Sequence, residues 1–299
     1  MGGIFSKIYI DGGKMDKYRL KKKIFIFNQY PEILEIEDSY LIIGSKEIFR
    51  TLDINQFDTV FTIYTLPIWI KHTLKQNHIN IIHLNEEGKV EKAYLHKKFT
   101  PESLILHSDE KAIQLLEQKA HTIDRLFKTY GAKSLLNYLL KKGIIPPVIN
   151  NHLNYILKSL LMDAFQLNCK LSNTKAVRIS NLFFNLTDSV IPFSFYDASL
   201  KAGLNPEAGF LNTASPSLVR DLTEIPKLNF LKKLHHLIHT GFFENRDFSR
   251  KNLPYTTVKL LKILSNYFFY SNRFKRIKEI LFKIEKFRRE TFREIPCSL

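Results

Sequence analysis

Apolar and polar residues alternate along the first hundred residues, which is the pattern of half-buried β-strands. Turn residues separate the candidate strands, which span 4–10, 22–28, 32–36, 40–44, 58–65, 79–84 and 89–95. Between two of them, LPIWIKHTLKQNH (66–78) has the spacing of an amphipathic helix, and Pro67 suits its first turn. The N-terminal part is therefore predicted to be mainly β with one helix.

From about residue 101 the apolar period lengthens to that of helices and stays there. The candidate helices span 108–129, 132–142, 151–167, 174–190, 193–202, 227–240, 256–270 and 272–293. Glycines and prolines near 143–147 and 203–209 separate several of them. The fold class is therefore predicted to be α+β, with a β-rich domain over 1–100 that makes partner contacts and an all-α domain over 101–299.

The composition is that of a folded protein with an anionic partner. Hydrophobic residues make up 44% of the 299 residues and aromatic residues 13%, which excludes disorder for the chain as a whole. The 45 lysines and arginines exceed the 29 acidic residues, giving a net charge of +16 that attracts polyanions. Nucleic acid is the first candidate partner, and an anionic membrane is the second.

The number of cysteines and the hydropathy of the chain indicate where in the cell the protein is expected. The two cysteines, Cys169 and Cys297, exclude a disulfide framework and a zinc site built from the cysteines of one chain, so a cytoplasmic location is expected. No apolar run approaches the roughly 20 residues of a spanning helix. The opening MGGIFS matches a short myristoylation pattern at Gly2, so a peripheral membrane protein stays open as an alternative.

The segment AGLNPEAGFLNTASPSLVRDLTE (202–224) is the least generic stretch of the chain. With a β-rich part before it and helices around it, it resembles the CRISPR-associated integrase and endonuclease family. That family comprises the larger of the two core proteins that insert new spacers into a CRISPR array. The positions that match are Gly203, Pro206, Gly209 and Phe210. The similarity runs in order over nearly the whole chain.

The resemblance implies a divalent metal, Mg²⁺ or Mn²⁺, held in the helical domain by a glutamate, a histidine and a carboxylate. The histidine position falls on Asn212, and the acidic pair of the following helix is kept as Asp221 and Glu224. The glutamate position falls on Tyr130, immediately before Gly131. Two of the three implied ligands are therefore replaced.

Strand transfer on DNA needs a metal ion to neutralise the phosphate and activate the attacking oxygen. Asp221 and Glu224 lie at i and i+3, so they could converge on one ion, and Asn212 could add a neutral oxygen. The phenol of Tyr130, with a pKa near 10, is neutral and supplies no charge. The prediction is an impaired or lost metal site. The alternatives are an active integrase, or a solvated acidic patch beside a capping asparagine and a core tyrosine.

The last predicted helix has an apolar stripe at Phe274, Ile277, Leu281 and Ile284. Its basic residues suit contact with DNA phosphates, although a solvated terminal helix is the alternative. The predicted DNA-binding residues are Arg273, Lys275, Arg276, Lys278, Lys283, Lys286, Arg288 and Arg289.

Two further expectations complete the prediction. His235 and His239 share a helix face at i and i+4, but no third metal ligand is evident, so they are expected to flank DNA or to pack at an interface. The resemblance implies double-stranded DNA, a homodimer and a small companion CRISPR adaptation protein as partners. A chain with an impaired metal site would also need an active paralogue.

Overall fold

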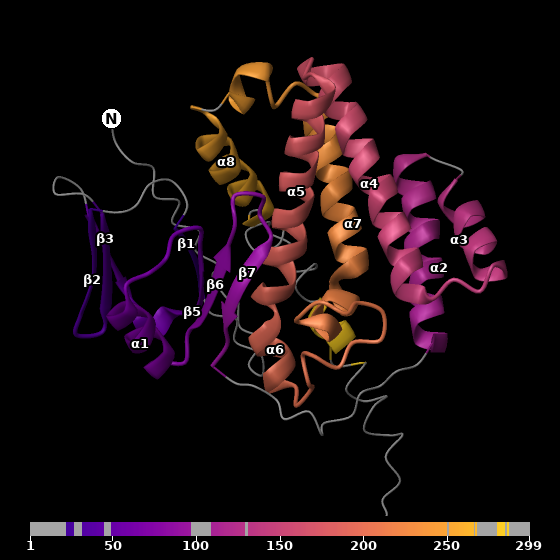
Figure 1. Cartoon of the computed structure of the whole chain (residues 1–299). Coiled ribbons are helices and arrows are strands. Elements are labelled where there is room, and N and C mark those ends of the chain that lie inside the picture. The colour runs from indigo at the N-terminus through magenta and orange to yellow at the C-terminus, as the bar shows by residue number, and fades with distance from the viewer. Residues whose placement is uncertain are drawn as a thin grey trace, which may run out of the picture. The chain divides into compact units, whose positions relative to one another are not determined.

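The computed structural model describes residues 22–26, 32–44, 49–96, 109–128, 131–249, 251–265, 267, 280–284 and 286 (Figure 1). Within these residues a strand-rich region that includes α1 and η1 comes first and a helical region follows, so the predicted α+β class is confirmed. The predicted strand at 4–10 and most of the predicted helix at 272–293 lie outside them. The chain divides into two compact units, one of 1–98 with 246–274 and one of 99–245 with 275–299.

The first unit contains a four-stranded sheet in the order β1 (Lys22–Ile26), β5 (Phe57–Thr62), β6 (Asn80–Leu84) and β7 (Val90–Tyr94). The first three strands are parallel, and β7 is antiparallel to β6. Helix α1 (Ile68–Gln76) makes the crossover from β5 to β6. It lies within the predicted helix at 66–78, but Pro67 is its N-cap residue rather than part of its first turn. Every residue of β5 is buried, as expected for a central strand of a parallel sheet.

A second sheet is antiparallel and follows the chain order β2 (Ile33–Glu37), β3 (Tyr40–Gly44) and β4 (Phe49–Asp53). The strand β4 was not predicted, because FRTLD has no alternation of apolar and polar residues. It is an edge strand whose first three residues are exposed, so pairing with β3 holds it rather than burial of one face. The short helix η1 (Ile54–Gln56) follows it.

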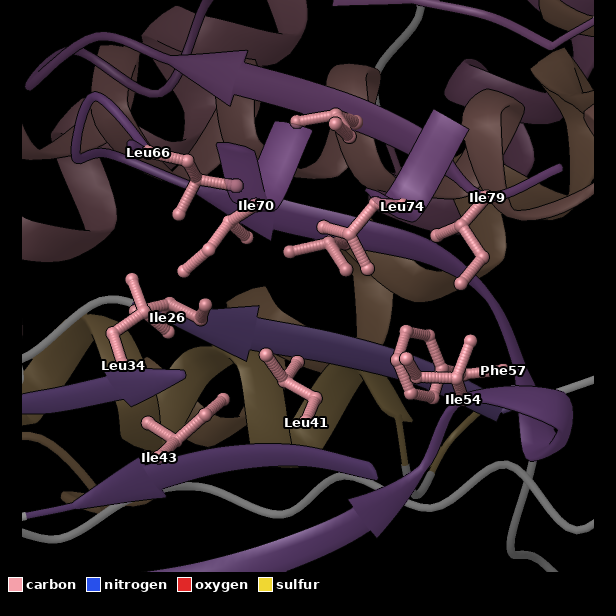
Figure 2. Close-up of a cluster of buried hydrophobic side chains, with 12 residues drawn as sticks. Ile26, Leu34, Leu41, Ile43, Ile54, Phe57, Leu66, Ile70, Leu74 and Ile79 are labelled. Atoms are coloured by element: carbon pink, nitrogen blue, oxygen red, sulfur yellow. The ribbon is translucent and has the colours of Figure 1, made fainter. Parts of the chain in front are cut away.

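Apolar side chains of both sheets and α1 meet in one core (Figure 2). Ile26 comes from the parallel sheet, Leu41 and Ile43 from the antiparallel sheet, and Ile70 and Leu74 from α1. Burying each such side chain contributes about 1.5–3 kcal/mol relative to exposing it. The alternating pattern of the sequence thus places one face of each sheet in this core.

The second unit is helical, with α7 (Ser217–His239) packed against α2, α4 and α5. The other helices are α2 (Asp109–Phe127), α3 (Ala132–Lys141), α4 (Pro146–Cys169), α5 (Asn173–Ser194) and α6 (Tyr196–Lys201). The elements η2 (Asn245–Phe248) and α8 (Leu253–Ser265) follow α7 in the chain, and α8 belongs to the first unit. Among the described residues, no helix has the length and hydropathy that crossing a membrane requires.

Helix α7 begins ten residues earlier than the helix predicted at 227–240. The predicted helix starts directly after Pro226, whereas the observed helix contains this proline. A proline removes one backbone hydrogen bond and is expected to end or kink a helix. Here most residues on both sides of Pro226 are buried against neighbouring helices. Tertiary packing therefore carries α7 through the proline, and the segment SLVRDLTE forms its first turns.

Candidate functional site

The loop 202–216 packs directly onto the start of α7. The Gly209 N–H donates to Ser217 Oγ over 3.0 Å, and the Leu218 N–H donates to the Pro206 carbonyl over 2.9 Å. A Cβ atom at Gly209 would lie 2.6 Å from the backbone carbon of Ser217, closer than such atoms can approach. A glycine is therefore required here, and its absent side chain lets the loop reach the helix.

Asp221 of α7 fastens this loop with both of its carboxylate oxygens. Its Oδ2 accepts hydrogen bonds from the backbone N–H groups of Phe210 and Leu211, at 2.7 and 3.0 Å. Its Oδ1 accepts from the backbone N–H of Asn212 at 2.9 Å and from Asn212 Nδ2 at 2.6 Å. Burial raises the pKa of Asp221 to about 6, although these hydrogen bonds favour the charged form.

Glu224, almost one helical turn further along α7, is engaged by two lysines. The Nζ of Lys119, on α2, lies 2.8 Å from Oε2, and the Nζ of Lys227 lies 2.8 Å from Oε1. The exposed fractions of the three side chains are 1%, 0% and 3% for Glu224, Lys119 and Lys227. The carboxylate thus lies between two ammonium groups in a site closed to water.

The ion pairs continue to α5. Lys227 Nζ donates to Asp188 Oδ1 at 2.7 Å, and Arg220 Nη1 donates to Asp188 Oδ2 at 2.5 Å. Burial works against these charges, but the neighbouring cations hold the pKa of Glu224 and of Asp188 below the ordinary range of carboxyl groups. Both acids are therefore anions at neutral pH.

Two asparagines of α4 complete the surroundings of Lys119. Its Nζ donates to Asn150 Oδ1 at 2.5 Å and to Asn154 Oδ1 at 2.7 Å. Asn150 Nδ2 in turn donates to Asn212 Oδ1 at 3.1 Å. Polar contacts therefore run without a break from the loop through α4 to the lysine on α2 and on to Glu224.

Comparison with known proteins places this arrangement in a known fold. No family model and no curated protein matches the sequence. Among solved structures, the chain is similar to a Cas1 protein from Thermotoga maritima, with a TM-score of 0.62 at 14% identity, covering 91% of this chain and 97% of that one. The chain has the fold of the CRISPR integrase family.

Two other solved structures share this integrase fold. A casposase bound to its integration product has a TM-score of 0.59 at 14% identity, covering 88% of this chain and 89% of that one. A chain of a Cas6-RT-Cas1–Cas2 complex has a TM-score of 0.69 at 12% identity, and the match covers 94% of this chain but 36% of that one. The predicted resemblance is thus confirmed in the fold, over nearly the whole chain.

The site of this integrase fold does not fit a magnesium or manganese ion as its residues are arranged. Both oxygens of Asp221 accept hydrogen bonds from the loop, and both oxygens of Glu224 face lysines. The Asn212 oxygen accepts from Asn150, and its nitrogen faces Asp221. In the part of the chain that is described, no group of three or more His, Cys, Asp or Glu residues could hold a metal ion.

The structure brings three of the predicted site residues together, Asn212, Asp221 and Glu224. Asn212 Nδ2 lies 2.6 Å from Asp221 Oδ1 and 3.5 Å from Glu224 Oε1. The other partners of Asp221 are backbone N–H groups of the loop, whereas those of Glu224 are lysines. Tyr130 lies outside the described residues. The two carboxylates therefore have different partners, since Asp221 binds the loop and Glu224 binds Lys119 and Lys227.

Sequence reasoning missed Lys119, although a signal was present. In α2 the buried residues Leu116, Ala120 and Ile123 form one apolar stripe at helical spacing, and Lys119 lies on that stripe. A lysine on the buried face of a helix needs an anionic or polar partner. The partner, Glu224, is more than a hundred residues away, so the sequence could not identify it.

The two histidines of α7 contact each other. The Nε2 atoms of His235 and His239 lie 3.2 Å apart, and Asn168 Nδ2 lies 3.0 Å from His239 Nδ1. Burial, with the nearby His239 and Lys232, lowers the pKa of His235 to about 4. His235 is thus neutral at pH 7, and the expectation that the two histidines flank DNA stays a prediction.

The predicted DNA-binding helix is described only in part. Residues 280–284 are helical, and Leu281 and Ile284 of the predicted apolar stripe are buried. Lys283 is half-buried and Lys286 is exposed. The other predicted DNA-binding residues lie outside the described part of the chain, namely Arg273, Lys275, Arg276, Lys278, Arg288 and Arg289.

Proposed function

We propose that this chain acts in CRISPR spacer acquisition as a DNA-binding subunit with the integrase fold, in a structural rather than a catalytic role. The integrase fold and the net charge of +16 support the DNA-binding part. The observation that carries the structural role is the position of Glu224 between Lys119 and Lys227. In this arrangement the acidic group that would receive a metal ion is already neutralised by the chain.

A divalent ion would have to displace these lysines in order to bind Glu224. Mg²⁺ and Mn²⁺ prefer hard oxygen ligands and usually take at least one or two carboxylates from the protein. At Glu224 the ion would meet the ammonium groups of Lys119 and Lys227, whose like charge repels it. Metal-assisted strand transfer, which needs an ion beside the reacting phosphate, is therefore disfavoured.

The solved structures with this fold support the partners of the proposal. The casposase structure contains an integration product, and the Cas6-RT-Cas1–Cas2 complex contains Cas2. We accordingly include in the proposal double-stranded DNA, a small companion adaptation protein and a homodimer. Because a structural subunit joins no DNA by itself, we also include an active paralogue that retains its metal ligands.

The test uses the wild-type chain, so that no variant can fail by misfolding. Purified protein is incubated with a prespacer-like duplex and a target duplex, in Mn²⁺ or in EDTA, and joined products are measured. We expect no joining in either condition and equal affinity for the duplex in both. Joining that requires Mn²⁺ would refute the structural role and would support an active integrase.

Salt dependence of binding tests the DNA-binding part separately. Each phosphate contact adds about −0.9 to the slope of log K against log salt concentration. We expect Lys283→Glu with Lys286→Glu to make this slope less steep than in the wild type. Exposed Lys233 of α7 gives the matched control as Lys233→Glu. Binding that is insensitive to salt would contradict phosphate recognition.

A further inference from the structure

Lys119 has the surroundings of a bound cation. Its side chain is fully buried, and its ammonium nitrogen lies within 2.8 Å of one carboxylate oxygen, from Glu224, and two amide oxygens, from Asn150 and Asn154. An ammonium group has three N–H donors, so three oxygens match its number of donors. Three acceptor oxygens therefore surround the nitrogen, as suits the charged ammonium form of the side chain.

The same oxygen types are those that hard divalent cations select. Mg²⁺, Mn²⁺ and Ca²⁺ are bound by carboxylates and by the carbonyl oxygens of asparagine side chains. Here these oxygens converge on a point that a side-chain nitrogen occupies. The oxygens come from α4 and α7, whereas the nitrogen comes from α2.

Burial works against this charge. It lowers the pKa of Lys119, and the nearby Lys227 lowers it too, while the Glu224 carboxylate raises it. A neutral amine would leave the Glu224 anion facing Lys227 alone, and it would give the asparagine oxygens weaker hydrogen bonds. The contacts therefore favour the charged lysine.

We propose that the Lys119 ammonium is a resident cation that takes the place of a divalent metal ion in this site. It joins α2, α4 and α7 in the way that a metal ion bridges its ligands. The arrangement of the site, and DNA binding that depends on it, then require no metal. The inference concerns the same site as the proposed function, but it is tested by metal binding without DNA.

The inference predicts that reversing the charge of one residue creates a metal site. The variant Lys119→Glu adds a carboxylate beside Glu224, and Asn212→His supplies the imidazole that the family resemblance implies. The double variant K119E/N212H would then carry a glutamate, a histidine and a second carboxylate. The matched control is K119Q/N212H, which removes the ammonium without adding a negative charge.

The experiment measures Mn²⁺ binding by electron paramagnetic resonance and the thermal midpoint Tm, each in Mn²⁺ and in EDTA. We expect the wild type to bind no stoichiometric Mn²⁺ and to keep the same Tm. In K119E/N212H one equivalent should bind, and Tm should rise by about 3–6 °C when free Mn²⁺ is ten times the Kd. The control should show a markedly smaller rise.

Two results would overturn the proposal. One is stoichiometric Mn²⁺ binding by the wild type, and the other is a folded K119E/N212H that binds no more Mn²⁺ than its control. If the double variant does not fold, ¹⁵N NMR of the wild type decides, with Lys119→Met identifying the resonance. A slowly exchanging ammonium signal of Lys119 at neutral pH supports the resident cation, and a neutral amine refutes it. Joining of DNA by the wild type would refute the proposed function, and it is measured in a separate experiment, because the metal-binding and NMR measurements contain no DNA.

Discussion

The substitution Lys119→Met tests how far the buried lysine stabilises the helical unit. Methionine keeps much of the length and volume of the side chain, so the change removes the charge and the three donors while leaving the packing nearly intact. Removing one partner of a buried ion pair costs about 3–5 kcal/mol. In the variant, Glu224 still has Lys227 at 2.8 Å. The stability lost with this ion pair is therefore expected at the lower end of that range.

The asparagines add to this loss. The oxygens of Asn150 and Asn154 each lose a charged donor, and a buried acceptor left without a partner costs about 1–3 kcal/mol. Rearrangement of the side chains will recover part of that cost. We therefore expect K119M to lower the free energy of unfolding by about 3–5 kcal/mol, or the Tm by on the order of 10 °C.

Urea unfolding followed by far-ultraviolet circular dichroism is the suitable assay. The signal is dominated by helices, most of which lie in the second unit, whereas the single tryptophan, Trp69, lies in the first. Lys233→Met, at an exposed position of α7, is the matched control and should change the free energy of unfolding by less than about 0.5 kcal/mol.

A double-mutant cycle separates the charge pair from other effects. If Lys119 stabilises the fold through Glu224, then K119M in a Glu224→Gln background should cost markedly less than K119M alone. The reasoning is refuted if K119M is as stable as the control variant. It is equally refuted if the losses of K119M and E224Q simply add, since additive losses mean that the two groups do not interact.

Three further predictions concern the loop and the carboxylate that holds it. Asp221→Ala removes four hydrogen bonds, so hydrogen exchange at the backbone amides of Phe210 and Leu211 should accelerate by at least tenfold, while amides of α1 stay unchanged. Because burial raises the pKa of Asp221 to about 6, its contribution to stability is full below about pH 4 and is lost as the pH rises through 6. A carboxyl-carbon titration by NMR checks this, and a midpoint near 4 would contradict it. Gly209→Ala places a Cβ 2.6 Å from backbone of Ser217, so it should lower the free energy of unfolding by about 1–3 kcal/mol or more, whereas Gly143→Ala meets no neighbouring atom and is limited to the strain of its positive φ.

Much of the first unit could be predicted because its signals are local. Alternation of apolar and polar residues indicated β2, β3, β5, β6 and β7 within a few residues of their observed bounds. The missed strand, β4, has no such alternation, because its hydrogen bonds to β3 rather than burial of one face hold it in place. The local pattern thus predicts strands that bury one face, and it misses an edge strand that is held by hydrogen bonds to its neighbour.

The long helix α7 shows the limit of local rules in the second unit. The predicted helix at 227–240 starts directly after Pro226, a residue that disfavours a helix interior, yet the observed helix extends from Ser217 to His239. Burial against α2, α4 and α5 outweighs the lost hydrogen bond. That packing depends on residues far away in the chain, and no window around the proline contains it.

By itself the sequence determined the α+β class, the order of strands and helices, and a segment at 202–224 that carries the family resemblance. The family resemblance also implied that Asn212, Asp221 and Glu224 belong to one site, and the structure brings them together. Tertiary structure decided what these residues contact. Only the packing of α2 and α4 on α7 brings Lys119 and Asn150 to Glu224. Charges that are buried together shift one another's pKa values, and these shifts depend on distances in space rather than on spacing along the chain.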